Sequence, residues 1–165
     1  MYICKPERKV FQVKMLLAVS VIVTAGLFLI STLFENHSAL VRFLGFASLM
    51  LSILFNVRYS LTEFEYSVSD GDFSVTKITG NRRQQVCCVA LESAVDLYTK
   101  RDYQHLPSNE KGIIKYSLNQ NMKANSYVFL CEFNGKRAMI EFEPNEAFVS
   151  ILKQEITAYK KAEEQ

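Results

Sequence analysis

Two long apolar stretches stand near the start of the chain, separated by four residues. Residues 15–34 carry no charged side chain, and residues 39–57 carry one, Arg42. A helix of 20 residues rises about 30 Å, the thickness of the hydrocarbon core of a bilayer. Because the connection is so short, the two helices must run antiparallel. The pattern therefore predicts a two-helix transmembrane hairpin over residues 15–57.

Basic residues outside the apolar stretches predict how this hairpin is oriented. The N-terminal arm, residues 1–14, carries a net charge of +3, and Arg58 directly follows the second stretch. The opposite side offers only Arg42, which Glu35 opposes. Lys and Arg are enriched in cytoplasmic segments, so we expect both termini in the cytoplasm. The residues expected at the membrane interface are Lys5, Arg8, Lys9, Lys14, Arg58 and Tyr59.

A cleaved signal peptide is the competing interpretation of residues 1–34. Signal peptides have an apolar core of about 7–15 residues and small residues at the cleavage site. Here the apolar run is longer, lacks small residues in that arrangement, and is followed at once by a second run. An uncleaved hairpin is therefore the interpretation that we adopt.

After residue 58 the pattern changes to short stretches with the period of two, or the β-branched and aromatic composition, of strands. Seven such stretches are present, at residues 64–68, 73–76, 84–91, 94–98, 113–118, 127–133 and 138–143. Asp70-Gly71, Gly80-Asn81 and Asn134-Gly135 are turn signals, because glycine accepts positive φ. Residues 100–112 are polar, contain Pro107 and Gly112, and predict a long loop.

An amphipathic helix follows the last predicted strand. Pro144, Asn145 and Glu146 supply a helix start, and the apolar positions 148, 151, 152, 156 and 159 form one stripe. Seven strands in a four-plus-three arrangement with a closing helix match the pleckstrin-homology-like plan. Lipocalin-like and SH3-like barrels are alternatives that accommodate the final helix less well. We expect a membrane α-hairpin plus an α+β domain at 58–165, a pleckstrin-homology-like, seven-stranded split barrel with a C-terminal helix.

Two stretches resemble a family of uncharacterised bacterial membrane proteins, in which a two-helix anchor precedes a cytoplasmic, pleckstrin-homology-like domain of unknown function. They are YSLTEFEYSVSDGDFSVTKITGNRRQQ (59–85) and SYVFLCEFNGKRAMIEFEPNEAFVSILKQEI (126–156). The resembling features are turns, a strand pair and a helix start rather than catalytic residues. Members usually carry a longer basic run where this chain has only Arg82 and Arg83. The resemblance implies this architecture in a bacterial inner membrane and leaves activity open.

Composition supports the division of the chain. Hydrophobic residues make up 49% of the whole but 29 of the 43 residues in 15–57. The remainder, 58–165, carries 14 basic and 15 acidic residues, a net charge of −1. A slightly acidic domain without a recognised reader motif is not expected to bind nucleic acid.

Cysteine and histidine offer no recognisable catalytic or metal-binding set. Cys87 and Cys88 are adjacent in a predicted strand, so their side chains face opposite sides and cannot ligate one metal. We expect Cys88 and Cys131 in the core. His37 and His105 lie on opposite sides of the predicted membrane and outside any zinc motif. The sequence therefore predicts no catalytic residue, no metal and no cofactor; a dyad of His105 with a cysteine is the minority hypothesis.

Charged residues that lie close together in the predicted domain are candidate sites. Glu63 and Glu65, like Glu141 and Glu143, are two residues apart and share a strand face, which we expect to be solvated. A second group is basic and lies around the first hairpin, where phosphoinositide-binding pleckstrin-homology domains meet phosphates. The candidate anionic-ligand residues are Lys77, Arg82 and Arg83.

The function expected is a membrane-anchored, non-enzymatic binding module that presents its domain to a protein partner at the cytoplasmic membrane face. An anionic-lipid-sensing domain is the alternative, and a membrane-bound enzyme is less favoured. Gly45, Ser48 and Ser52 share one face of the second apolar helix. Small residues allow helices to pack closely, within the hairpin or in a homo-oligomer.

Overall fold

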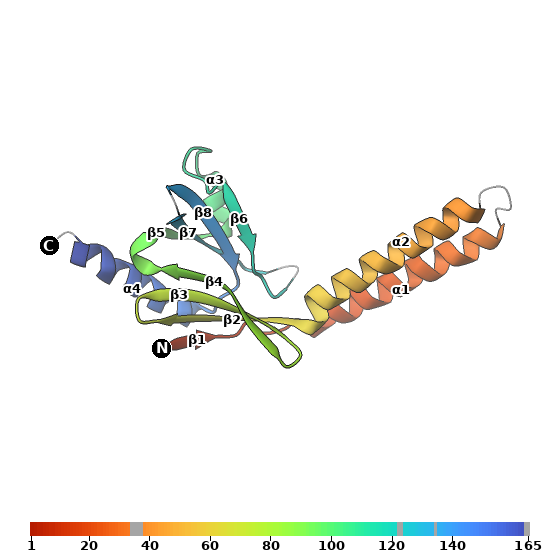
Figure 1. Ribbon diagram of the computed structural model, residues 1–165, viewed down its shortest axis with the longest axis horizontal. Helices are drawn as coiled ribbons and strands as arrows, with labels where there is room; N and C mark the ends of the chain where they lie inside the picture. The colour runs from red at the N-terminus through yellow and green to blue at the C-terminus, as the bar shows by residue number, and fades with distance from the viewer. Residues whose placement is uncertain (34–37, 122–123, 134, 164–165) are drawn as a thin grey trace. The chain divides into compact units, whose positions relative to one another are not determined.

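The computed structural model describes residues 1–33, 38–121, 124–133 and 135–163 (Figure 1). It divides into two compact units. The two-sheet unit comprises Met1–Arg8 and Glu63–Gln165, and the helical unit comprises Lys9–Thr62. The two-sheet unit is therefore assembled from both ends of the chain.

The helical unit consists of α1 (Val10–Leu33) and α2 (Ser38–Asn56), with α2 continued by one π-helical turn, η2 (Val57–Leu61). Two segments of it, Phe11–Leu33 and Ala39–Leu61, are long and apolar enough to cross a membrane, by length and composition. This agrees with the two predicted apolar helices. The predicted connection, with Glu35 and His37, lies outside the described residues, as does Phe34.

Small and aromatic side chains form the contact between the two helices. A Cβ added to Gly45 would meet the ring of Phe28 at 3.4 Å, so glycine lets that ring lie against α2. The hydroxyls of Thr24 and Ser48 lie 3.4 Å apart, within hydrogen-bond distance. The predicted small-residue face at Gly45 and Ser48 thus faces α1, which confirms packing within the hairpin.

The two-sheet unit holds two four-stranded sheets, with orders β1-β2-β3-β4 and β5-β7-β8-β6. The seven strands predicted after residue 58 are all present, and the described residues contain an eighth, β1. The strands are β1 (Tyr2–Cys4), β2 (Thr62–Ser69), β3 (Asp72–Thr79), β4 (Arg82–Ala90), β5 (Ala94–Thr99), β6 (Ile114–Ser117), β7 (Tyr127–Phe133) and β8 (Lys136–Phe142). The pair β6–β8 is parallel, whereas β7–β8 is antiparallel.

Strand β1 corrects the expectation that residues 1–14 form only a basic arm. It pairs antiparallel with β2, with Tyr2 opposite Val68 and Cys4 opposite Tyr66. Three residues are too few to show a period of two, so this strand left no signal in the sequence. The two sheets consequently have four strands each, rather than four and three.

The turns follow the glycine signals. Asp70 and Gly71 have φ of 53° and 83°, and Gly135 has φ of 70°. Phe133 pairs with Lys136 across the last hairpin, whose Asn134 lies outside the described residues. The predicted hairpins are therefore confirmed by positive φ at the glycines that link their strands.

The predicted loop 100–112 contains a short helix, α3 (Lys100–His105). Its cap is Thr99, whose hydroxyl accepts a hydrogen bond from the backbone N–H of Asp102 at 3.2 Å. Tyr103 accepts a hydrogen bond from the N–H of Gly112 at 2.9 Å. Helix α3 packs on one face of the second sheet through a small apolar cluster of Tyr103, Val128, Leu130 and Met139. Six residues are too few for a helical period, so the sequence predicted only a loop.

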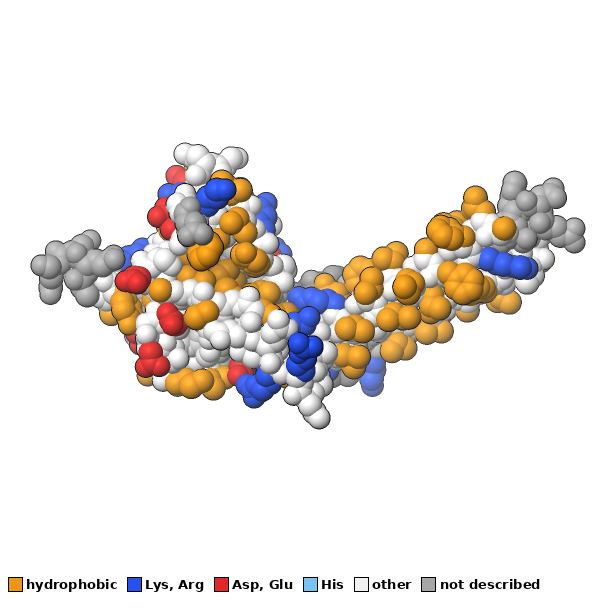
Figure 2. All heavy atoms as spheres, in the orientation of Figure 1, with side chains coloured by type: hydrophobic (Ala, Val, Ile, Leu, Met, Phe, Trp, Pro, Cys, Tyr) orange, Lys and Arg blue, Asp and Glu red, His pale blue; other side chains and the backbone are white. Residues whose placement is uncertain are grey.

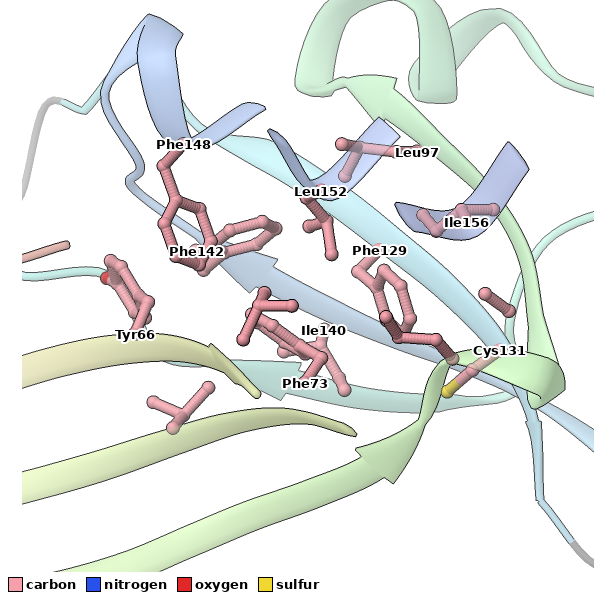
Figure 3. Close-up of a cluster of buried hydrophobic side chains, with 14 of the residues drawn as sticks. Tyr66, Phe73, Leu97, Phe129, Cys131, Ile140, Phe142, Phe148, Leu152 and Ile156 are labelled. Atoms are coloured by element: carbon pink, nitrogen blue, oxygen red, sulfur yellow. The ribbon is translucent and has the colours of Figure 1, made fainter. Parts of the chain in front are cut away.

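The main core lies between the sheets and α4 (Glu146–Glu163) (Figure 3). The ring centroid of Phe73 lies 5.0 Å from that of Phe129 and 5.1 Å from that of Phe142. Phe148, Leu152 and Ile156 of α4 point toward these rings. Burial of each such side chain stabilises the fold by about 1.5–3 kcal/mol. The predicted cap is also present, because Asn145 Oδ1 accepts a hydrogen bond from the N–H of Phe148 at 2.8 Å.

Candidate functional site

The three predicted anionic-ligand residues lie on the β3–β4 hairpin, but they do not converge. Thr79 pairs with Arg82 and Ile78 with Arg83, which places Lys77 and Arg82 on one face and Arg83 on the other. The guanidinium of Arg83 forms an ion pair with Glu65. The structure therefore leaves two cations together where the sequence offered three.

Glu65 joins the N-terminal segment to the β3–β4 hairpin. Its side chain is 8% exposed and lies 2.9 Å from the ammonium group of Lys5 as well as against Arg83. Burial raises the pKa of Glu65, but the hydrogen bonds and charges of Lys5 and Arg83 outweigh it, so the pKa is lowered. The expectation of a solvated Glu65 was wrong, because the chain on either side of it supplies two cations that cover it. Neighbouring Glu63 stays exposed.

The remaining residues expected at the membrane interface are spread over the segments beside the helices. Arg8 forms an exposed ion pair with Glu63 at 3.1 Å. Lys9 directly precedes α1, and Lys14 lies within its first turns. In η2 the guanidinium carbon of Arg58 lies 5.2 Å from the centroid of the Tyr59 ring, a cation–π contact.

A buried polar segment, Asn119 to Asn121, hydrogen-bonds to strands of both sheets. Gln120 is 2% exposed, and its Oε1 accepts a hydrogen bond from the N–H of Phe64 at 2.9 Å. Asn119 donates to Glu141 at 2.8 Å, and Lys100 donates to the same carboxylate at 2.5 Å. Burial raises the pKa of Glu141, yet these hydrogen bonds lower it overall. Glu141 is thus buried and partnered, which corrects the expectation of a solvated strand face.

The feature that the sequence did not reveal is an apolar groove between the two sheets, called here the β4–β6 groove. It has a volume of about 210 Å³. Its lining residues come from four strands and are Val86, Cys87, Cys88, Val89, Ile114, Tyr116, Cys131, Phe133, Ala138 and Ile140. Strand β4 ends the first sheet and β6 ends the second, so the groove is bounded by two sheet edges. These residues come together only because strands far apart in the sequence pair, so no local sequence pattern predicts the groove.

Residues 5–159 match the family model described as Bacterial PH-like domain (DUF6106). The chain belongs to this family. The matched range contains both apolar helices as well as nearly all of the two-sheet unit, which confirms the resemblance drawn from the hairpin and helix-start motifs. No curated protein and no solved structure matches the chain.

Three cysteines of this PH-like unit line the groove. Cys131 is buried, as predicted, but Cys88 is exposed and Cys87 is the one that packs against the core. Cys87 pairs with the fully buried Val75, and Cys88 with Ser74 on the outer face. The expected burial of Cys88 was therefore wrong, since the mixed polar and apolar residues of β4 do not show which of its faces is buried.

The two less exposed groove thiols, Cys87 and Cys131, are poor nucleophiles. Burial raises the pKa of Cys87 and of Cys131 to about 11, so both are protonated at neutral pH. His105 ends α3 and is not among the residues that line the groove. Within the described part of the chain, no group of three or more His, Cys, Asp or Glu side chains is placed to hold a metal ion. The groove lining is mainly apolar, and its thiols at Cys87 and Cys131 are held protonated.

Proposed function

We propose that this protein is a membrane-anchored, non-enzymatic binding module that presents its PH-like unit to a protein partner at the cytoplasmic face of the bacterial inner membrane. One observation carries the topology. Strand β1 precedes α1 and strand β2 follows α2, yet the two strands pair with each other. If α1 and α2 span a bilayer, the chain must return to the side from which it left.

The charges next to the helices support the cytoplasmic side. Lys9, Lys14 and Arg58 lie at the helix ends that join the two-sheet unit, whereas Arg42 lies near the other end of α2. The positive-inside tendency favours the cytoplasm for the end with more cations. Both termini and the whole PH-like unit are then cytoplasmic.

The β4–β6 groove supports binding rather than catalysis. Tyr116 is 49% exposed and Phe133 is 61% exposed, and both line the groove. Exposed apolar side chains that gather in one place mark interaction surfaces. The same groove contains thiols held protonated by burial and no imidazole. A partner that covers these side chains would remove apolar surface from water.

Capture from membranes tests this function. A tagged full chain, extracted from bacterial membranes in mild detergent, should retain one protein in near-stoichiometric amount. An unrelated two-helix membrane protein with the same tag, prepared in parallel, should not retain it. Repeated recovery of the tagged chain alone, by quantitative mass spectrometry, would contradict the proposal.

Anionic lipid sensing is the alternative function, and the pair Lys77 and Arg82 supports it. It has less support than protein binding because Arg83 is held by Glu65. If it is correct, Lys77→Ala with Arg82→Ala should lower the ratio of phosphatidylglycerol to phosphatidylethanolamine that copurifies with the full chain, by about twofold, corresponding to a few tenths of a kcal/mol. Lys153→Ala, a change on the exposed side of α4, is the matched control.

A further inference from the structure

Strand β4, which bounds the groove, is an edge strand of its sheet. Strand β4 is nine residues long and is the last strand of its sheet, so within the described residues its outer backbone edge has no neighbouring strand. Edge strands present rows of N–H and C=O groups that another extended chain can pair with. All nine β4 side chains are exposed or half-buried, so none of them is enclosed in the core.

Apolar side chains stand beside this edge. Val86, Tyr116 and Phe133 are 38%, 49% and 61% exposed, and all three line the groove. Ile114 and Tyr116 are two residues apart on β6, so they share one strand face. Two side chains with this spacing can contact alternate side chains of an extended peptide, which also repeat every two residues.

The Phe133 end of the groove carries a basic side chain. Lys136 lies opposite Phe133 in the β7–β8 register, so the two side chains share the strand face that lines the groove. Lys136 is exposed and belongs to no ion pair within the described part of the chain. Figure 2 shows hydrophobic side chains gathered beside β6, with Lys and Arg side chains bordering them. A ligand with acidic residues next to its apolar ones complements this rim.

We propose that the β4–β6 groove binds an extended segment of a partner protein, with alternating apolar residues flanked by Asp or Glu, which adds as a strand to β4. This proposal rests on the protein-binding function above and names its site. An acyl chain would fill the apolar volume but has no backbone donors or acceptors for the edge of β4. A helix satisfies its own backbone groups and would leave that edge unpaired.

Peptide selection on the full chain tests the proposal. The full chain is reconstituted in lipid nanodiscs and panned with a phage library of random 12-residue peptides, with empty nanodiscs as the counter-selection. Enriched sequences should alternate apolar residues and carry flanking Asp or Glu. A fluorescein-labelled synthetic copy of the most enriched sequence is then titrated by fluorescence anisotropy.

Three sets of variants report on the site. Tyr116→Ala with Phe133→Ala should weaken binding at least tenfold, and Lys136→Glu should weaken it severalfold. Ile113→Ala, at 76% exposed and outside the groove lining, is the matched control and should change the affinity less than twofold. N-methylation of alternate peptide amides should abolish binding in one register and spare it in the other.

Other outcomes overturn the proposal. They are no enrichment over empty nanodiscs, equal binding by the groove variants, a methylation effect that is the same in both registers, or crosslinks showing that a second copy of the chain fills the groove. Failure of the groove is separable from failure of the function. If wild type captures a partner and Tyr116→Ala with Phe133→Ala captures it equally, the site is wrong and the function stands; if wild type captures none, the function itself fails.

Discussion

The helical unit and the two-sheet unit place the same kinds of residue in opposite positions. Ile22 and Phe43 on the helices are 70% and 71% exposed, whereas Phe73 and Phe129 between the sheets are fully buried. In Figure 2 hydrophobic side chains cover the helical unit over much of its visible surface. Such a surface suits a lipid solvent, since lipid tails are as apolar as the side chains. Composition alone therefore does not say what an apolar residue contacts.

Polar groups show the complementary difference. In the helices, hydroxyls bond to the turn before them: Ser20 donates to the Leu17 carbonyl at 2.9 Å and Ser52 to that of Ser48 at 2.8 Å. In the two-sheet unit, buried polar groups bond to residues far away in the chain, as Gln120 does to Phe64. Apart from the contact between Thr24 and Ser48, these helix hydroxyls are thus satisfied within their own helix, whereas the buried polar groups between the sheets depend on the tertiary fold.

Truncating one aromatic residue in each unit should give the largest difference in stability between the two units. Phe73→Ala removes a fully buried ring and should lower the free energy of unfolding by about 3–5 kcal/mol. Phe43→Ala removes an exposed ring and should lower it by less than about 1 kcal/mol. Denaturant titration of the full chain in mild detergent, followed by far-UV circular dichroism at a β-sheet wavelength, measures both. Equal losses would contradict a division into lipid-facing and buried aromatic residues.

Removing one carboxylate should separate the partnered from the exposed acids. Glu65→Gln leaves Lys5 and Arg83 without their shared buried partner and should cost about 1–2 kcal/mol, reduced by the exposure of the two cations. Glu63→Gln, which breaks the exposed pair with Arg8, should cost less than about 0.5 kcal/mol. The same denaturant titration checks both, and a cost for Glu63→Gln as large as that for Glu65→Gln would show that burial does not strengthen the pair.

Acid should destabilise the two-sheet unit through the same carboxylates. The folded-state pKa of Glu65 and of Glu141 lies below the ordinary value of 4.5. Their stabilisation is therefore complete above about pH 4.5 and is lost as the pH falls through the lowered values. Melting temperatures of the wild-type chain should fall across that window. Glu65→Gln should show a smaller fall, because the contribution of Glu65 is then removed; an unchanged slope would exclude Glu65 as a contributor.

Thiol labelling should give a smaller but sharp readout of strand register. Of the four cysteines, Cys88 is the exposed one, while Cys4 and Cys131 are buried and Cys87 is half-buried. Iodoacetamide at pH 7.5 should therefore modify Cys88 faster than the other three cysteines, and Cys88→Ser should remove that fastest phase with a change in stability of less than about 0.5 kcal/mol. Intact-mass spectrometry follows the reaction. A fast phase that survives in Cys88→Ser would show that β4 has the opposite register.

Much of the fold was readable because its signals are local. The apolar lengths predicted both helices, alternation with glycine turns predicted seven strands, and Asn145 with the apolar stripe predicted α4. Strand β1 and helix α3 were missed because three and six residues carry no measurable period. The faces of Glu65 and Cys88 were misassigned because burial of a strand face depends on which segment covers it. The groove was missed for the same reason, since its lining comes from β4, β6, β7 and β8.

By itself, the sequence determined the family, the apolar hairpin, and the number and order of the strands that follow it. Those properties follow from motifs and from local patterns of apolar and polar residues, which can be identified directly in the sequence. Three features followed only from the tertiary structure. Residues 2–4 pair with β2 as the edge strand of the first sheet, Glu65 and Glu141 are buried with partners, and two sheet edges bound an apolar groove. Each of these joins residues far apart in the chain, and such pairings form only because the whole core stabilises them together.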